Sequence, residues 1–173
     1  MDADNERESG DNVDWTSPIW SRETPTRFWD PGRKLLKSIR DYQRIRDNGG
    51  PLRRLRSILC VLRHRFWSAV SGAEIDLSCN IGGGLLIPHP NGIVIHPDSR
   101  VGINCLIFQQ VTLAGGPQLG DHVDIGAGAK VLGKLHIGND VRIGANAVVT
   151  RDVADGLTVA GIPARVIGES PGD

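Results

Sequence analysis

Apolar residues in the second half of the chain recur at every sixth position. Stepping by six from Ile95, ten positions in succession carry an aliphatic side chain. They are Ile95, Val101, Ile107, Leu113, Leu119, Ile125, Val131, Ile137, Ile143 and Val149. A period of six matches neither a helix, which repeats at about 3.6 residues, nor a strand, which repeats at 2. It is typical of a parallel β-helix, in which each hexad forms a short strand and a turn and three hexads complete a triangular coil.

An earlier run of isoleucines has the same period but a different phase. Ile75, Ile81, Ile87 and Ile93 are spaced by six, two residues out of phase with the series that starts at Ile95. The slip follows the segment 88–92, Pro-His-Pro-Asn-Gly, whose prolines and Asn-Gly pair favour a rigid turn. We expect this turn to bulge from the regular coil, and a stiff irregularity on a solenoid is the first place to look for chemistry.

Residues 33–70 have a helical pattern instead. Apolar residues from Leu35 to Ile45 predict a first helix that ends at Asn48-Gly49-Gly50, and Pro51 suits the first position of a second. The second helix has an apolar seam of Leu52, Leu55, Leu59, Leu62 and Phe66, with arginines around it. We expect the seam to pack on the adjacent β-helix and cap its open end; contact with an anionic membrane surface is possible but not favoured.

Charge is distributed in blocks, although 20 basic and 20 acidic residues cancel. Residues 1–30 hold three basic and eight acidic side chains, and residues 33–65 hold eleven and two. We interpret residues 1–32 as an acidic flexible tail, 33–70 as a basic helical segment, 71–168 as the β-helix and 169–173 as a short tail. The zero net charge gives no reason to expect a nucleic-acid partner. Three widely spaced cysteines, no signal peptide and no long apolar run favour a reducing, cytoplasmic location.

Residues 71–168 resemble the hexapeptide-repeat acyltransferases, and within them the serine acetyltransferase-like group. The resemblance lies in the strings GGGLLIPHPNGIVIHP, IFQQVTLAGG, IGAGAKVLG, IGANAVVTRDV and AGIPARVIG. It implies a mainly β fold, a left-handed parallel β-helix with a short N-terminal α-helical segment. It also implies a homotrimer with active sites in the grooves between copies. The implied reaction is acetyl transfer from acetyl-CoA to a hydroxyl group, of L-serine in the group's own reaction, with no metal.

The same resemblance implies roles for individual residues. His89 matches the catalytic histidine, a general base for direct transfer, because a largely neutral imidazole can accept the hydroxyl proton. Glu74, fifteen residues earlier, stands where the family has an aspartate that orients the histidine; Asp76 is a rival for that role. The matching cofactor-binding positions are Gly115, Ala127, Arg142, Ala145, Ala160 and Gly161, with Lys130 and Arg165 as alternative phosphate contacts. Small residues at β-helix corners are also required by packing alone.

Two departures from the family pattern leave the acceptor open. The family's loop with an Arg-His pair is missing, because the six-residue register runs from Leu113 to Leu119 without a slip. Pro88 also replaces an aspartate that grips the serine amino group. L-serine therefore competes with a sugar or surface-polysaccharide hydroxyl as acceptor.

Two other classes of function compete with acetyl transfer. A non-catalytic β-helix scaffold is one. A zinc site of the γ-type carbonic anhydrase kind, built from His96, His122 and His136, is the other, and the fourteen residues between His122 and His136 argue against it.

Overall fold

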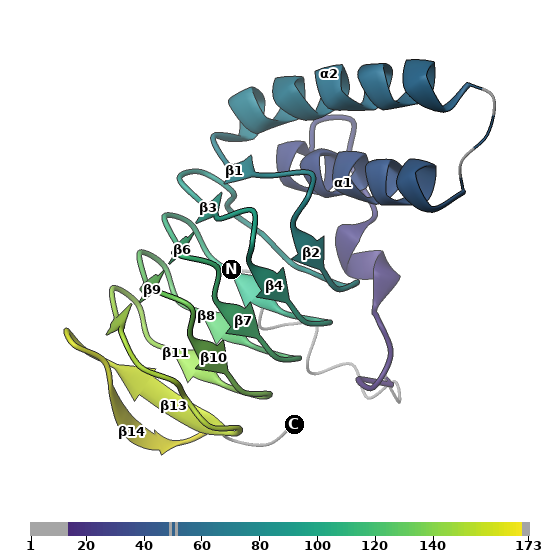
Figure 1. Ribbon diagram of the computed structural model, residues 1–173. Helices are drawn as coiled ribbons and strands as arrows, with labels where there is room; N and C mark the ends of the chain where they lie inside the picture. The colour runs from purple at the N-terminus through teal and green to yellow at the C-terminus, as the bar shows by residue number, and fades with distance from the viewer. Residues whose placement is uncertain (1–13, 49, 51, 171–173) are drawn as a thin grey trace.

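A computed structural model describes residues 14–48, 50 and 52–170. The first helix among the described residues is a 3₁₀ helix, η2 (Trp20–Glu23). It is followed by α1 (Pro31–Asn48) and α2 (Arg53–Ser71), after which the chain winds into a solenoid of short parallel strands (Figure 1). The strands are β1 (Glu74–Ile75), β2 (Asn80–Ile81), β3 (Val94–Ile95), β4 (Arg100–Val101), β5 (Leu106–Ile107), β6 (Thr112–Ala114), β7 (Gln118–Leu119), β8 (Asp124–Ile125), β9 (Lys130–Leu132), β10 (His136–Ile137), β11 (Arg142–Ile143), β12 (Val148–Val149), β13 (Leu157–Ala160) and β14 (Arg165–Glu169).

The strands form three sheets, one for each side of a triangular coil. Sheet A has the order β1-β3-β6-β9-β12, sheet B has β10-β7-β4-β2, and sheet C has β14-β13-β11-β8-β5. All pairs are parallel except β13 with β14, which form an antiparallel hairpin at the C-terminal end. The turns between successive sheets stack into three rows. Corner AB joins sheet A to sheet B, as at residues 115–117, and corner BC joins sheet B to sheet C, as at 120–123. Corner CA joins sheet C to the next strand of sheet A, as at 126–129.

The strand register confirms both the six-residue repeat and its single slip. Ile95 pairs with Leu113, and Leu113 pairs with Val131, so a regular coil has 18 residues. Ile75 pairs with Ile95, so the first coil has 20. The two extra residues fall between Leu86, which pairs with Leu106 in sheet C, and β3 in sheet A. The turn that contains His89 is therefore the enlarged one, on corner CA.

The aliphatic residues of the repeat form the interior, as predicted. All ten residues of the series from Ile95 to Val149 are at most 3% exposed. Each side chain stacks on its equivalent in the neighbouring coil, because paired strands place equivalent positions one above another. Burying such a side chain contributes about 1.5–3 kcal/mol, so the column is the main source of stability in this half of the chain.

Helix α1 closes the N-terminal end of the solenoid. Leu35, Leu36 and Ile39 are at most 1% exposed and belong to the same buried cluster as the interior of the coils. Without such a cover, the first coil would expose both apolar side chains and unpaired strand edges to water. The expectation that the 33–70 segment caps the solenoid is thus confirmed for α1.

A buried ion pair completes this cap. The Arg40 guanidinium donates to both carboxylate oxygens of Glu23, at 2.8 and 2.7 Å. Arg40 also donates to the carbonyl oxygens of Ile81 (2.6 Å) and Gly82, and the Glu23 carboxylate accepts a hydrogen bond from the Leu85 amide (3.0 Å). The pair therefore satisfies backbone groups of the first coil that lack a preceding coil to pair with.

The apolar seam of α2 faces outward and is exposed. Its residues Leu52, Leu55, Leu59, Leu62 and Phe66 are each 55–58% exposed. The expectation that this seam packs on the β-helix is wrong: α1 already fills the open end, and α2 buries its opposite face, including Cys60 and His64. Pro51 and Gly49 lie outside the described residues. In the described part of the chain, no helix is both long and apolar enough to cross a membrane.

Part of the expected flexible tail lies against corner BC. The side chain of Asn104 accepts a hydrogen bond from the Ile19 amide (2.8 Å) and donates to the carbonyl oxygens of Trp15 and Ser17 (3.1 and 2.8 Å). A second contact joins His122 Nε2 to the Trp15 carbonyl oxygen at 2.7 Å. Asn104 binds the segment because its amide, carried outward at a corner, offers both a donor and an acceptor. Residues 1–13 and 171–173 lie outside the described residues.

We predict that replacing Arg40 by alanine lowers the free energy of unfolding by about 3–5 kcal/mol, because the Glu23 carboxylate would stay buried without a partner. Urea unfolding followed by circular dichroism measures the change. Arg44→Ala is a matched control, because Arg44 is 69% exposed and only 3.5 Å from Asp41 at the surface, and it should change stability by less than about 0.5 kcal/mol. Equal effects of the two substitutions would contradict the role given to the buried pair.

Candidate functional site

His89 lies exposed on the enlarged turn of corner CA. Pro88 and Pro90 flank it, and the Ile93 amide donates to the Pro90 carbonyl oxygen (3.1 Å), which closes the turn. Helix α1 supports the turn from behind: a Cβ atom on Gly32 would lie 3.0 Å from the Ile87 carbonyl oxygen and 3.5 Å from Pro90. The turn and its backing by α1 fix the backbone at His89 and leave the imidazole exposed.

Beyond the turn of His89, corner CA continues through Phe108-Gln109-Gln110 and then through turns made mostly of small residues, at 126–129 and 144–147. Backbone hydrogen bonds link its turns in series, from Gln110 to Asn91 (3.0 Å), from Gly128 to Gln109 (2.9 Å), from Asn146 to Ala127 (2.8 Å) and from Val148 to Gly161 (3.0 Å). Three predicted cofactor residues, Ala127, Ala145 and Gly161, therefore lie on the same row of turns as His89. Ala160 directly precedes this row, at the end of β13. With side chains this small, a long thin ligand can lie close to the backbone along the row.

The other two predicted cofactor residues, Arg142 and Gly115, lie outside the turns of corner CA. Arg142 lies in β11 of sheet C, one strand before the turn that contains Ala145, and its Nε is 3.9 Å from the Asp124 carboxylate. Gly115 lies on corner AB, and its φ of +82° together with the close approach of Gly133 excludes a side chain. In one copy of the chain, Gly115 is therefore on a different corner from His89.

A cation lies on corner CA as well. The Lys130 ammonium donates to the carbonyl oxygens of Gln110 (2.9 Å) and Gly128 (2.7 Å), both in turns of this corner. Arg165, the other alternative for phosphate, lies in β14 and donates to the Ala164 carbonyl oxygen (2.8 Å). Lys130 is thus the basic residue that the fold places among the small residues.

Glu74 and its rival Asp76 differ in what occupies their carboxylates. The Asp76 carboxylate accepts hydrogen bonds from the amide and hydroxyl of Ser78, at 2.7 and 2.6 Å, and these bonds lower its pKa. The Glu74 amide donates to the Ile93 carbonyl oxygen (2.8 Å), directly after the His89 turn, while its side chain is exposed. Among the described residues, no hydrogen bond or ion pair is recorded for the Glu74 carboxylate, either to His89 or to another group.

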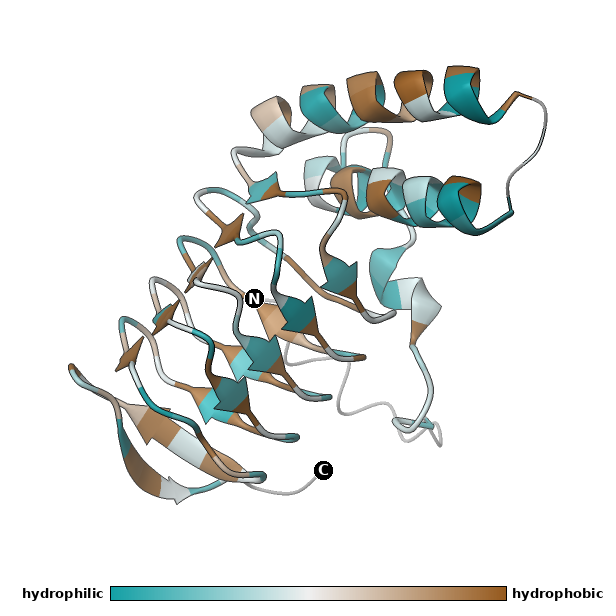
Figure 2. Ribbon diagram, viewed as in Figure 1, coloured by the Kyte–Doolittle hydropathy of each residue, from teal (hydrophilic) through white to brown (hydrophobic). Residues whose placement is uncertain are grey.

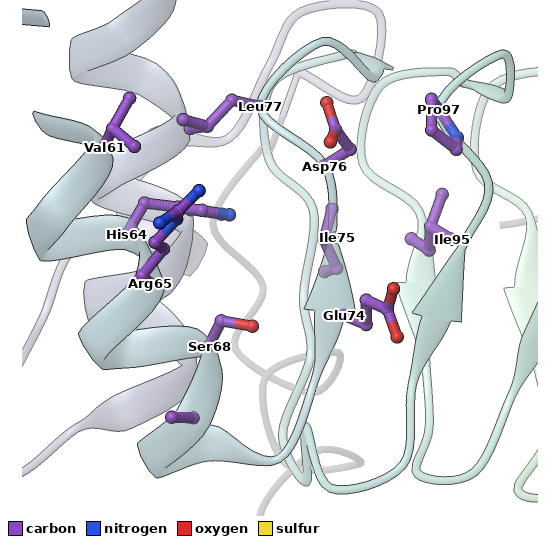
Figure 3. Close-up of a pocket in the computed structure, with 11 residues that line it drawn as sticks. Val61, His64, Arg65, Ser68, Glu74, Ile75, Asp76, Leu77, Ile95 and Pro97 are labelled. Atoms are coloured by element: carbon purple, nitrogen blue, oxygen red, sulfur yellow. The ribbon is translucent and has the colours of Figure 1, made fainter. Parts of the chain in front are cut away.

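A pocket with both apolar and polar side chains in its lining opens beside Glu74, between α2 and the first strands of sheet A (Figure 3). Its volume is about 450 Å³, and His64 and Ser68 point into it from α2 toward β1. The lining also includes Arg65, Glu74 and Asp76, whereas His96 is not part of it. The Ser68 hydroxyl donates to the Ala73 carbonyl oxygen (2.6 Å) and Ser78 engages Asp76, so the Glu74 carboxylate and the Arg65 guanidinium are the groups best placed to bind a polar ligand.

The sequence did not predict the α2 side of this pocket. His64 and Ser68 lie on the helix face opposite the apolar seam, so the pattern assigned them to solvent. His64 is instead 7% exposed, with its Nδ1 3.0 Å from the Ser38 hydroxyl. The only available signal was the basic and polar character of that face, which does not distinguish a pocket wall from a solvated surface.

The other histidines and the cysteines have local roles. His122 Nδ1 is 3.0 Å from the Asp140 carboxylate, which adds to its contact with Trp15. Within the described ranges, no three histidine, cysteine or acidic side chains are grouped so as to hold a metal ion. Burial raises the pKa of Cys79 to about 11 and that of Cys105 to about 12, so both thiols stay protonated and are poor nucleophiles.

His64 gives the protein a pH dependence of stability. Burial lowers the pKa of His64 from its ordinary 6.5, so protons bind more readily to the unfolded chain than to the folded one. Above about pH 6.5 the imidazole is neutral in both the folded and the unfolded chain and does not oppose folding. Below about pH 6.5 the unfolded chain binds the proton more readily, so the free energy of unfolding should fall. We predict a lower melting temperature at about pH 5.5 than at about pH 7.5, with a smaller difference in His64→Gln. The exposed His136, changed to Gln, should keep the wild-type difference; an unchanged pH response in His64→Gln would contradict the prediction.

Comparison with known proteins identifies relatives of this chain. The family described as "Bacterial transferase hexapeptide (six repeats)" matches residues 116–151. A serine acetyltransferase of Mycobacterium tuberculosis is 43% identical over 161 residues, which cover 88% of this chain and 60% of the relative. One from Synechococcus elongatus is 48% identical over 109 residues, which cover 58% of this chain and 45% of the relative. The chain thus spans about half the length of these relatives.

Solved structures of serine acetyltransferases have the same fold. One in complex with CoA superposes with a TM-score of 0.69 at 33% identity, covering 80% of this chain and 57% of that one. The Neisseria gonorrhoeae enzyme in complex with serine gives a TM-score of 0.69 at 31% identity, covering 81% and 58%. The predicted fold class, a left-handed parallel β-helix with an N-terminal α-helical segment, is confirmed.

Proposed function

We propose, for a chain that belongs to the serine acetyltransferase-like hexapeptide-repeat acyltransferases, that it transfers the acetyl group of acetyl-CoA to a hydroxyl group of a small acceptor. The observation that carries the proposal is the exposed imidazole of His89 on corner CA, the corner whose later turns, 126–129 and 144–147, are made mostly of small residues. The CoA complex of a related structure supports acetyl-CoA as the co-substrate. The expected homotrimer and cytoplasmic location belong to the same proposal.

His89 acts as the general base in this proposal. Its neutral nitrogen accepts the proton of the acceptor hydroxyl while the oxygen attacks the thioester carbonyl carbon. The tetrahedral intermediate then expels the CoA sulfur, which takes a proton from the imidazolium, so the histidine returns to its neutral form. The buried, protonated thiols argue against a covalent acetyl-cysteine, and direct transfer needs none.

Glu74 is a positioning residue in the same scheme. Its carboxylate has no recorded partner among the described residues, whereas that of Asp76 is engaged by Ser78. Glu74 is also attached through its amide to the segment after the His89 turn. A carboxylate that approaches the imidazole when substrates bind would fix its tautomer and stabilise its charged form.

The ligand's path follows the small residues of corner CA. Ala127, Ala145 and Gly161 leave room for the pantetheine arm, and Ala160 borders its end. The Lys130 ammonium, which contacts the turns of corner CA, is the candidate cation for a CoA phosphate, and Arg142 flanks the same row from β11. Since His89 is exposed in a single chain, a neighbouring copy would supply the other wall of the groove, and Gly115, on corner AB, would contribute from that copy.

We predict that His89→Ala lowers kcat/KM by about 10²–10⁴-fold, the usual contribution of a general base. Release of the CoA thiol is the readout, with the melting temperature measured to show that the variant folds. His136→Ala, which removes an exposed imidazole from β10 on another face, should retain full activity. Full activity in a folded His89→Ala variant would contradict the role given to His89, whereas no thiol release by the wild type would favour a non-catalytic scaffold.

L-serine is the leading acceptor, because the relatives are serine acetyltransferases and one related structure holds serine. A sugar or surface-polysaccharide hydroxyl is the second candidate, and a specific observation favours it. Strand β6 passes to β7 through the short Gly115-Gly116-Pro117 turn, with no loop to carry charged groups toward an amino acid. Pro88, next to His89, likewise offers no charge to a substrate ammonium group.

Thiol release with each acceptor separates the two candidates. If L-serine is the substrate, it should support turnover that saturates in the millimolar range or below, the usual range of KM. If a sugar is the substrate, nucleotide sugars or oligosaccharides should support turnover while L-serine gives only the slow background hydrolysis of acetyl-CoA. His89→Ala is the control in both assays, because either reaction needs the same base.

A further inference from the structure

The exposed face of α2 is a continuous apolar stripe. Its six side chains, each 55–58% exposed, are Leu52, Leu55, Ile58, Leu59, Leu62 and Phe66. At 100° per residue they fill a sector about 120° wide along the helix. Figure 2 shows hydrophobic residues recurring along α2, which lies on the outside of the molecule. A soluble chain rarely leaves a patch of this kind without a partner.

Aromatic residues extend the stripe at the C-terminal end of α2. The Phe66 and Trp67 rings are 5.0 Å apart, and the Trp67 and Trp29 rings are 6.0 Å apart. Trp29 is 62% exposed and its neighbour Phe28 is 90% exposed. The stripe and these two residues contain eight of the fourteen large apolar side chains that are exposed in the described part of the protein. The exposed apolar surface is therefore concentrated in one place.

Arginines border the stripe on both sides. At 100° per residue, Arg56 and Arg63 flank one edge, and Arg54 and Arg65 flank the other. Arg63 is paired with Asp41 at 2.6 Å, but no ion pair is recorded for the other three among the described residues. They belong to the block 33–65, which carries eleven basic and two acidic residues, a net charge of +9. The surface thus combines an apolar centre with cationic margins.

We propose that α2 lies in the interface of an anionic phospholipid bilayer, with its apolar stripe in the acyl region and its arginines at the headgroup phosphates. An apolar sector with basic margins is the form that interfacial helices take. Trp29 and Phe28 then sit at the level where aromatic side chains are favoured. The helix lies on the surface, since no described helix is apolar enough to span a membrane.

The positive charge around the stripe favours an anionic lipid surface over a second copy of the chain as its occupant. A second copy packed face to face would bring a block of +9 against another block of +9, which is repulsive. Residues 1–13 of the same chain have only Met1, Ala3 and Val13 as apolar side chains, too few to cover six large ones. An anionic surface both covers the apolar residues and neutralises the margins. Arg65 also lines the pocket beside Glu74, so this pocket would open beside the membrane.

Sedimentation with vesicles tests this inference without any enzymatic assay. The full chain is mixed with vesicles of phosphatidylcholine alone, or with about 30% phosphatidylglycerol added to give an anionic surface. We expect binding to the anionic vesicles that weakens with salt, and little binding to the neutral ones. The double variant Leu59→Glu with Leu62→Glu should bind the anionic vesicles at least about tenfold more weakly, because it places charge at the centre of the buried face.

A matched control variant carries the same charges elsewhere. Val166→Glu with Ile167→Glu alters two exposed apolar residues of β14, far along the chain from α2, and should bind like the wild type. Melting temperatures establish that both double variants fold. No binding of the wild type to anionic vesicles would overturn the proposal, as would equal binding of the two double variants. A fall in oligomer mass in the α2 variant, seen by sedimentation velocity without vesicle binding, would assign the stripe to a second copy.

Discussion

The structure depends on closing the first coil of a stack in which every coil is held by its neighbours. The strands are mostly two residues long, so each has little stability by itself and gains it from the strand above and the strand below. The first coil has no coil above it. Helix α1 supplies the missing layer with Leu35, Leu36 and Ile39, and the Arg40–Glu23 pair satisfies the backbone groups that a preceding coil would have paired. The ion pair is stabilising here because both partners also bond to backbone.

The same cap determines how firmly His89 is held. The turn of His89 belongs to the first coil, and it is the one turn with two extra residues, so it has the weakest support from the repeat itself. Gly32 at the start of α1 comes close to Ile87 and Pro90 because it has no side chain. Helix α1 therefore both closes the solenoid and packs behind the turn of the candidate base.

The three corners of the solenoid have different surroundings. Corner BC receives the segment from Trp15 to Ile19 through Asn104 and His122. Corner AB turns tightly through Gly115 and Gly116, both with positive φ, and has no inserted loop in coil three. Corner CA keeps its small residues uncovered in the described chain and carries His89 and Lys130. Corner AB also carries an exposed imidazole, His96, but corner CA is the one on which His89 shares a row of turns with Ala127, Ala145 and Gly161. Helix α2 likewise has two different faces: His64 and Ser68 line the pocket, and the apolar stripe faces outward.

The sequence by itself determined the parts that depend on local periodicity. The six-residue repeat predicted the coil, its buried aliphatic series and the slip that marks the His89 turn, because in a solenoid each position meets its own equivalent one coil later. The residue pattern around His89, through its resemblance to the acyltransferase family, also predicted this histidine as the candidate base. Positions on corner CA, such as Ala127 and Ala145, followed from the same register, while Gly115 proved to lie on another corner.

Only the tertiary structure decided which surfaces meet across long separations in sequence. The pattern of α2 predicted an amphipathic helix correctly but assigned its apolar seam to the wrong neighbour, because periodicity defines a face and not what covers it. The coil is capped by α1, whose Leu35, Leu36 and Ile39 occupy its open end. His64 and Ser68 became pocket residues, and Asn104 a docking point for the N-terminal segment, through contacts between residues that are distant in sequence. Such contacts have no local signal, since they are fixed by the packing of whole elements.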